Sequence, residues 1–175
     1  GSKGHRAARR YLIEQMTSRG LVGYHDRDAT EYELPYQYHK IDFCNLIGVL
    51  PGQDQSLAPV LLAAHYDTCG PYPGADDNAS GVAAVLEVAQ AWSEAVAAGS
   101  VPAPEREVRF AVWGSEIHSS RAYLQRRGRE DGCVVETDVS VSHLVADMTG
   151  QGRLAALART VDEDDRRVDQ SHLET

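Results

Sequence analysis

The chain has 175 residues, 42% of them hydrophobic, and a formal net charge of −9 at pH 7. This composition excludes a disordered chain and predicts a domain with a sizeable core. The negative charge argues against nucleic acid and anionic membranes as partners. We recognise no transmembrane run and no signal peptide in the sequence, and the compartment stays open. Three widely spaced cysteines without a C-x-x-C pair indicate neither a disulfide framework nor a zinc knuckle.

We expect the first forty residues to serve mainly as a structural scaffold. Apolar side chains at helical spacing predict an amphipathic helix over residues 6–19, which ends at Gly20. Residues 21–40 are rich in tyrosine, histidine and acids, and predict a loop that leads to an edge strand. His25 and His39 are isolated in this segment, and we expect them to be surface residues without a metal.

The most informative stretch lies near the middle of the chain. Residues 60–64 form an apolar run that predicts a buried strand, with His65 and Asp67 at its carboxyl end. A loop rich in glycine and proline then presents Asp76 and Asp77 just before a helix. Histidine supplies a nitrogen ligand and aspartate an oxygen ligand to zinc, and a carboxylate two residues from the histidine can orient its ring. The stretch therefore predicts a metal site.

Two further segments carry candidate site residues. After a helix predicted at 82–98, residues 107–114 predict a strand that is followed by Glu116. The charged residues 126–137 predict a loop, and residues 140–148 predict another strand, which delivers Asp147 near its end. Acidic side chains at the carboxyl ends of strands lie where α/β folds usually place their sites.

These elements predict an α/β fold, a three-layer α/β/α sandwich around a mixed sheet. The predicted strands lie at 41–50, 58–65, 107–114 and 140–148. We expect a domain over residues 1–160 and an acidic tail over 161–175. A sheet that stops here has an open edge, which predicts poor solubility or a homo-oligomer.

The motifs around these residues resemble those of a known family. "HYDT" followed by "PGADDNASGVAAVLEVA", with "NLIGVLPG" before and "VADMTG" after, is similar to the zinc aminopeptidase family that includes bacterial leucyl aminopeptidases, glutamate carboxypeptidase and glutaminyl cyclases. The resemblance implies a phosphorylase/hydrolase-like zinc exopeptidase fold with its C-terminal part missing. It also implies that His65, Asp76 and Asp147 bind one zinc ion, that Asp76 bridges to a second, and that Asp67 orients His65.

The chain departs from the family pattern at one motif. The family has two adjacent glutamates, a general base and then a zinc ligand, whereas here Glu116 is followed by Ile117. Alignment from the preceding strand makes Glu116 the base, and alignment from the following helix requires about three missing residues. A natural deletion, an omitted loop and a lost ligand all fit this pattern. His118 and His172 are candidate replacement ligands, and one versus two zinc ions stays open.

Two functional hypotheses follow from the resemblance. The first is a zinc-dependent aminopeptidase that hydrolyses the N-terminal bond of a peptide substrate, with Glu116 and Asp67 as its catalytic residues. The second is a non-catalytic or impaired member of the same fold, which binds metal or peptide without turnover.

Overall fold

The structure is a computed structural model of the chain, and it describes residues 2–25, 31–68, 70–127 and 133–136. These residues all belong to the first of two units into which the chain divides, Gly1–Val139. The strand predicted at 140–148 lies outside the described residues. The domain boundary expected at residue 160 stays a prediction.

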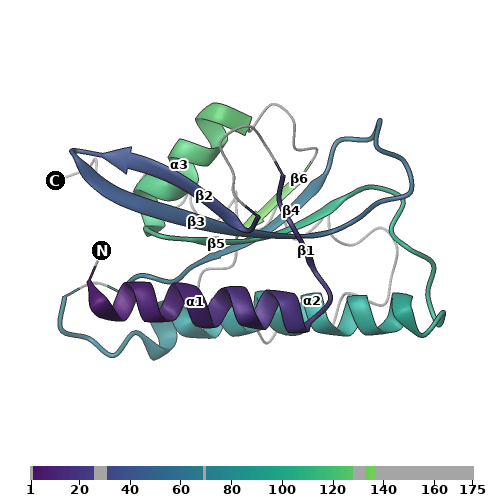
Figure 1. Cartoon of the computed structure of the whole chain (residues 1–175), viewed down its shortest axis with the longest axis horizontal. Coiled ribbons are helices and arrows are strands. Elements are labelled where there is room, and N and C mark those ends of the chain that lie inside the picture. Colours follow the sequence, from purple (N-terminus) through teal and green to yellow (C-terminus); the bar gives the residue numbers. More distant parts are fainter. Residues whose placement is uncertain (1, 26–30, 69, 128–132, 137–175) are drawn as a thin grey trace, which may run out of the picture. The chain divides into compact units, whose positions relative to one another are not determined.

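A mixed β-sheet forms the centre of the described unit (Figure 1). Its strands are β1 (Val22–Gly23), β2 (Glu33–Tyr38), β3 (Ile41–Leu50), β4 (Val60–His65), β5 (Val108–Trp113) and β6 (Cys133–Glu136). They are ordered β1-β3-β5-β4-β6, and β2 also pairs with β3. Both β5 and β6 run parallel to β4, whereas β1, β2 and β5 run antiparallel to β3. The carboxyl ends of β4 and β5 therefore lie next to each other, at the same end of these two parallel strands.

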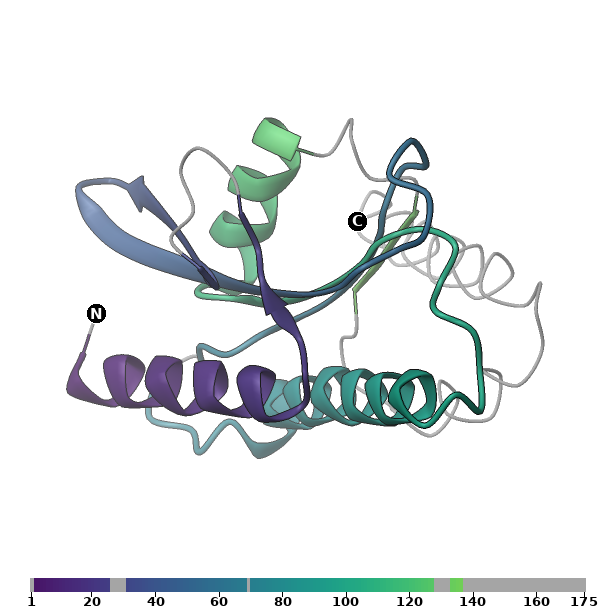
Figure 2. The same ribbon diagram turned by 45° about the vertical axis from the view of Figure 1, so that its right-hand side comes forward.

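Helices cover both faces of this sheet. Helices α1 (Lys3–Ser18) and α2 (Ser80–Ala97) lie side by side on one face, and α3 (Glu116–Arg127) lies on the other, as Figures 1 and 2 show from two directions. A short π-helical turn, η1 (Ala75–Ala79), leads into α2. The predicted sandwich of helices around a mixed sheet is confirmed. Within the described part of the chain, we find no helix that could cross a membrane.

The central strand β3 explains how the sheet is held between these layers. Residues 44–50 are all buried, which a strand covered on both faces requires. Alternate residues of β3 therefore point to opposite layers. The cluster on the α3 side contains Tyr24, Leu34, Ile47, Val49, Leu61, Ala63, Ala111, Trp113 and Tyr123. Asn45 is the polar exception among the buried residues 44–50, and it is only 1% exposed.

The first helix begins earlier than its periodicity predicts. It starts at Lys3 instead of residue 6, because the Ser2 side chain caps it by accepting a hydrogen bond from the backbone N–H of His5 (3.1 Å). A capping serine satisfies an N–H group that the helix itself leaves unpaired. This extension brings His5 into the helix.

Three strands lie outside the four whose bounds the sequence analysis gave, and one of them, β2, is the edge strand expected after the loop in residues 21–40. Within residues 21–40, β1 and β2 both pair with β3, and the exposed Pro35 lies in β2 at the edge of the sheet, as an edge strand allows. The charged segment 126–137 contains β6, which pairs in parallel with β4, and α3 continues into it as far as Arg127. A four-residue strand is too short to show a period among charged neighbours, so the loop prediction was wrong there.

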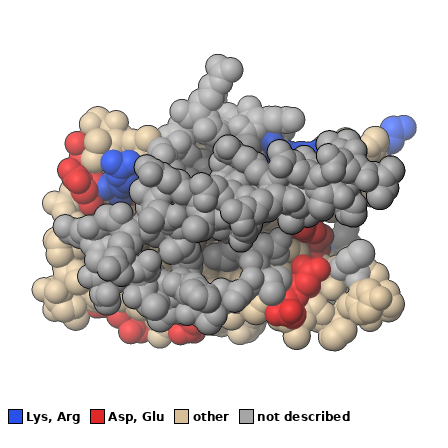
Figure 3. Space-filling model, turned by 180° about the vertical axis from the view of Figure 1, so that it is seen from behind, with Lys and Arg blue, Asp and Glu red and all other residues tan. Residues whose placement is uncertain are grey.

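Charged side chains of the described residues lie mainly on the surface. On the face shown in Figure 3, acidic groups are visible at the left, along the lower edge and at the lower right. Arg9 pairs with Glu33 (3.2 Å) and Arg19 with Glu87 (3.7 Å). These pairs are at least partly exposed, so each contributes no more than about 1 kcal/mol. Exclusion of nucleic acid, inferred from the net charge, stays a prediction.

Candidate metal-binding and catalytic site

His65 lies at the carboxyl end of β4, where two parallel strands end together. It is the last residue of β4 and is in register with Trp113, the last residue of β5. The imidazole is almost fully buried, with 3% of the residue exposed. A buried histidine at this edge requires polar partners for its ring nitrogens.

Two carboxylates approach the two ring nitrogens of His65. Its Nδ1 lies 3.1 Å from Oδ1 of Asp67, and its Nε2 lies 3.1 Å from Oδ1 of Asp77. A carboxylate only accepts hydrogen bonds, so either ring nitrogen can donate to the carboxylate beside it, and a neutral ring carries one such proton. When that proton is on Nδ1, the ring donates to Asp67 and Nε2 keeps its lone pair. The Nδ1-protonated form is the tautomer that a metal-binding histidine needs, and the structure places Asp67 where it can stabilise that form.

The charges around His65 change its proton affinity. Burial lowers the pKa of the imidazole, but the hydrogen bond to Asp67 and the negative charges of Asp67, Glu116 and Asp77 outweigh this effect. The net result is a pKa above its ordinary value. Three carboxylates therefore act on one imidazole, and the same charges favour a bound cation.

The carboxylate at Nε2 belongs to Asp77, the neighbour of the predicted Asp76. The turn is fixed by Asn78, which is 1% exposed and accepts a hydrogen bond from the N–H of Gly81 (3.0 Å). A Cβ on Gly81 would lie 2.2 Å from Oδ1 of Asn78, so only glycine fits. Asp76 is exposed, and its backbone carbonyl accepts from the hydroxyl of Ser80 (2.9 Å).

Glu116 lies beside the same site because β5 leads directly into α3. It is the first residue of α3, is exposed, and its backbone N–H donates to Oδ1 of Asp67 (3.0 Å). One oxygen of Asp67 therefore holds both the His65 ring and the first peptide unit of α3. The structure brings His65, Asp67 and Glu116 together, as the sequence analysis predicts.

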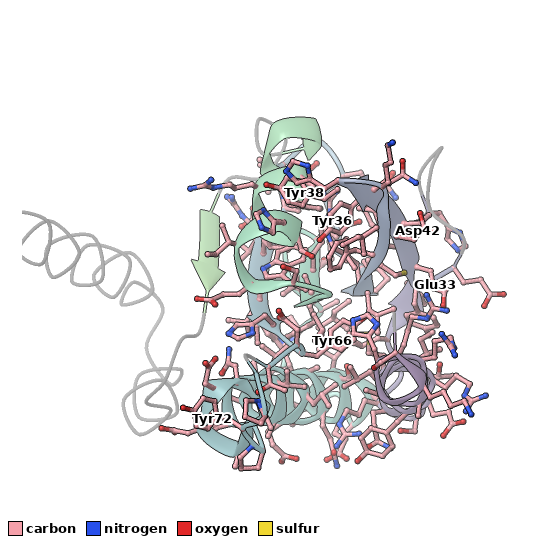
Figure 4. The ribbon with its side chains drawn as sticks, turned by 90° about the vertical axis from the view of Figure 1, so that its left-hand side faces the viewer. Glu33, Tyr36, Tyr38, Asp42, Tyr66 and Tyr72 are labelled. Carbon is pink, nitrogen blue, oxygen red and sulfur yellow. The ribbon has the colours of Figure 1, made fainter. Side chains whose placement is uncertain are left out.

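The other predicted histidines lie elsewhere or outside the described residues. His118 stacks on Tyr38 with 3.8 Å between ring centroids, and His39 contacts the same tyrosine edge-on at 4.2 Å. Figure 4 shows Tyr38 on the side of the sheet that carries α3. His25 is exposed. Asp147 and the candidate ligand His172 lie outside the described residues.

The donor atoms at His65 fit a zinc ion. Two donors with bonds of about 2.0–2.1 Å on one tetrahedral zinc lie about 3.3–3.4 Å apart. Nε2 of His65 and Oδ1 of Asp77 are 3.1 Å apart, which is close to this separation. Among the residues that the structure describes, no group of three histidine, cysteine or acidic side chains is arranged to hold a metal. The described part therefore supplies two donors and the group that orients one of them.

Comparisons with known proteins identify the family of the chain. The model of "Peptidase family M28" matches residues 45–173. A 69-residue segment, 38% of this chain, is 44% identical to "Probable lipoprotein aminopeptidase LpqL" of Mycobacterium tuberculosis and covers 13% of that protein. An "Aminopeptidase" of Pseudomonas aeruginosa is 37% identical over 75 residues, 41% of this chain and 13% of its own length.

A solved structure supports the same fold. The glutaminyl cyclase of Macrostomum lignano superposes with a TM-score of 0.60 at 21% identity, over 80% of this chain and 47% of its own. At this identity the likeness establishes the fold and no more. The segments matched to the two aminopeptidases span about an eighth of those proteins. The family model, in contrast, covers well over half of this chain. The chain belongs to peptidase family M28.

Proposed function

We propose that this chain forms the core of a zinc-dependent aminopeptidase that hydrolyses the N-terminal bond of peptides. The observation that carries the proposal is the arrangement around Asp67, which holds the metal-facing His65 and the backbone of Glu116 through one oxygen. The family and its aminopeptidase relatives support this reaction class.

His65 and Asp77 are the residues that would hold zinc in the described part. Asp147 stays the proposed third ligand, and Asp77 takes the place that the sequence analysis assigned to Asp76. When bound, zinc supplies Lewis acidity, which polarises a carbonyl group and makes a coordinated water molecule more acidic. The negative charges of the site stabilise a cation at this position.

Glu116 is the proposed general base. Its carboxylate accepts a proton from the attacking water and donates it to the amine that leaves when the peptide bond breaks. The carboxylate of Asp67 accepts a hydrogen bond from the Nδ1–H group of His65. This contact leaves the lone pair of Nε2 directed at the metal position. The backbone bond from Glu116 to Asp67 fixes the start of α3 relative to that imidazole.

The proposal is tested by zinc analysis of the purified chain together with a panel of chromogenic aminoacyl substrates. N-acetylated versions of the same substrates are the substrate controls, because an aminopeptidase requires a free α-amine. Glu116→Gln keeps the size of the side chain but removes its basicity. We expect this variant to bind zinc as the wild type does. Its rate of hydrolysis should be lower than that of the wild type by a factor of at least about 100.

Three outcomes contradict the proposal. The wild type binds no zinc, it releases no product after zinc is added, or Glu116→Gln is as active as the wild type. A wild type that binds zinc without turnover would instead support the non-catalytic hypothesis. Equal cleavage of free and N-acetylated substrates would exclude the aminopeptidase but not a peptidase.

A further inference from the structure

The backbone just before and at Glu116 is held by side chains from four separate parts of the chain. The N–H of Gly114 donates to Oδ1 of Asn45 (3.2 Å), and the carbonyl of Gly114 accepts from Nε2 of His5 (3.3 Å). The N–H of Ser115 donates to Oγ of Ser119 (2.7 Å). With the bond from Glu116 to Asp67 described above, the contacts come from α1, β3, the loop after β4, and α3.

We call these four contacts to residues 114–116 the frame of Glu116. Asn45 and Ser119 form its buried side. They are 1% and 0% exposed, and the Asn45 amide also donates to the carbonyl of Ser119 (3.3 Å). The hydroxyl of Tyr36 in β2 contacts Oγ of Ser119. Figure 4 shows Tyr36 on the α3 side of the sheet. A buried amide that uses both ends on one turn fixes that turn, because moving it would leave polar groups unpaired.

His5 closes the frame from the other face of the sheet. Its ring stacks on Tyr66 with 4.6 Å between centroids, and Tyr66 lies in the chain between His65 and Asp67. Since the carbonyl of Gly114 only accepts, Nε2 of His5 carries the proton in this contact. In Figure 4, Tyr66 lies on the side of α1 and α2. One side chain of α1 thus contacts the chain just beyond the ends of both β4 and β5.

We infer that His5, Asn45 and Ser119 are positioning residues for Glu116. The inference rests on the proposed function, since it concerns where the general base is held. A base must stay within hydrogen-bond reach of the water that it deprotonates, and a displacement of about 1 Å can cost roughly 100-fold in rate. The first helix is therefore part of the catalytic apparatus through His5, although no residue of α1 was a candidate by sequence.

His5 provides the cleanest test because it is only half-buried, so we expect its replacement to leave the fold intact. His5→Phe keeps an aromatic ring for Tyr66 but cannot donate to Gly114. His5→Gln keeps an amide donor without the ring. His25→Phe, at an exposed histidine, is the matched control. For each zinc-loaded variant, kcat, KM, zinc content and Tm are measured with the chromogenic aminoacyl substrate that the wild type cleaves best.

We expect kcat of His5→Phe to fall about tenfold, while KM and zinc content stay unchanged. This loss is smaller than the roughly 100-fold loss that a 1 Å displacement of the base can cause. His5→Gln should recover kcat to within about threefold of the wild type, and His25→Phe should match it. A His5→Phe variant with wild-type kcat overturns the inference, whatever its Tm. So does a loss of activity that follows lost zinc.

The same experiment separates this inference from the proposed function. If the wild type is inactive, the proposed function fails and the inference fails with it. If the wild type is active and Glu116→Gln is not, a normal His5→Phe variant overturns the positioning inference alone.

Discussion

Replacing Asp67 with alanine removes the one group that contacts both the proposed metal ligand and the proposed base. Its Oδ1 accepts from Nδ1 of His65 at 3.1 Å and from the N–H of Glu116 at 3.0 Å. Loss of the partner that orients a metal-binding histidine typically costs ten- to a hundredfold in metal affinity. Because the Asp67 side chain is 35% exposed, water replaces part of the lost bonding. We therefore expect the lower half of that range, about ten- to thirtyfold or roughly 1.4–2 kcal/mol.

The assay is competition for zinc between the protein and a chromogenic chelator at fixed pH. Asp67→Asn keeps an oxygen acceptor without the charge, and its affinity should fall less than that of Asp67→Ala, by about threefold. Asp54→Ala removes an exposed carboxylate elsewhere and controls for net charge. If Asp67→Ala binds zinc as tightly as the wild type, the orienting role assigned to Asp67 is refuted.

Two further predictions concern the turn before α2 and the buried thiol. Gly81→Ala puts a Cβ 2.2 Å from Oδ1 of Asn78 and should destabilise the fold by about 2 kcal/mol and weaken zinc binding. Gly4→Ala, whose Cβ meets nothing closer than 3.7 Å, should do neither, as urea unfolding and chelator competition will show. Burial raises the pKa of Cys44 from 9.0 to about 11, so near pH 8 its reactive thiolate is about a hundredfold scarcer than in the unfolded chain. Peptide mapping after alkylation should show slow labelling of Cys44 that becomes fast in urea, and fast native labelling would contradict its burial.

The sequence predicts the centre of the fold well because burial there leaves a strong pattern. β3 matches its predicted bounds, 41–50, and β4 is recognised from an apolar run that ends at His65. A strand covered on both faces must be apolar almost throughout, so composition alone identifies it. The strand at 133–136 is not recognised, because its four residues are stabilised by pairing with β4 rather than by any local pattern.

The site is only partly predictable for a related reason. His65 is the last residue of β4, and Asp67 and Glu116 come soon after β4 and β5, so the strand pattern places all three where these two parallel strands end. Whether Asp76 or Asp77 faces the imidazole depends on the backbone of the turn between them and α2, which no spacing rule specifies. Asn45 did carry a signal, since a polar residue inside the buried part of a strand needs buried partners.

The most direct test of the account is the zinc affinity of Asp77→Asn compared with that of Asp76→Asn. Both changes remove one negative charge from the same turn and keep the side-chain size, so general electrostatic effects cancel. Because Oδ1 of Asp77 lies 3.1 Å from Nε2 of His65, Asp77→Asn should weaken zinc binding by at least about 100-fold. Asp76→Asn should stay within about threefold of the wild type. Zinc binding that is lost in Asp76→Asn and kept in Asp77→Asn would contradict the site described by the structure.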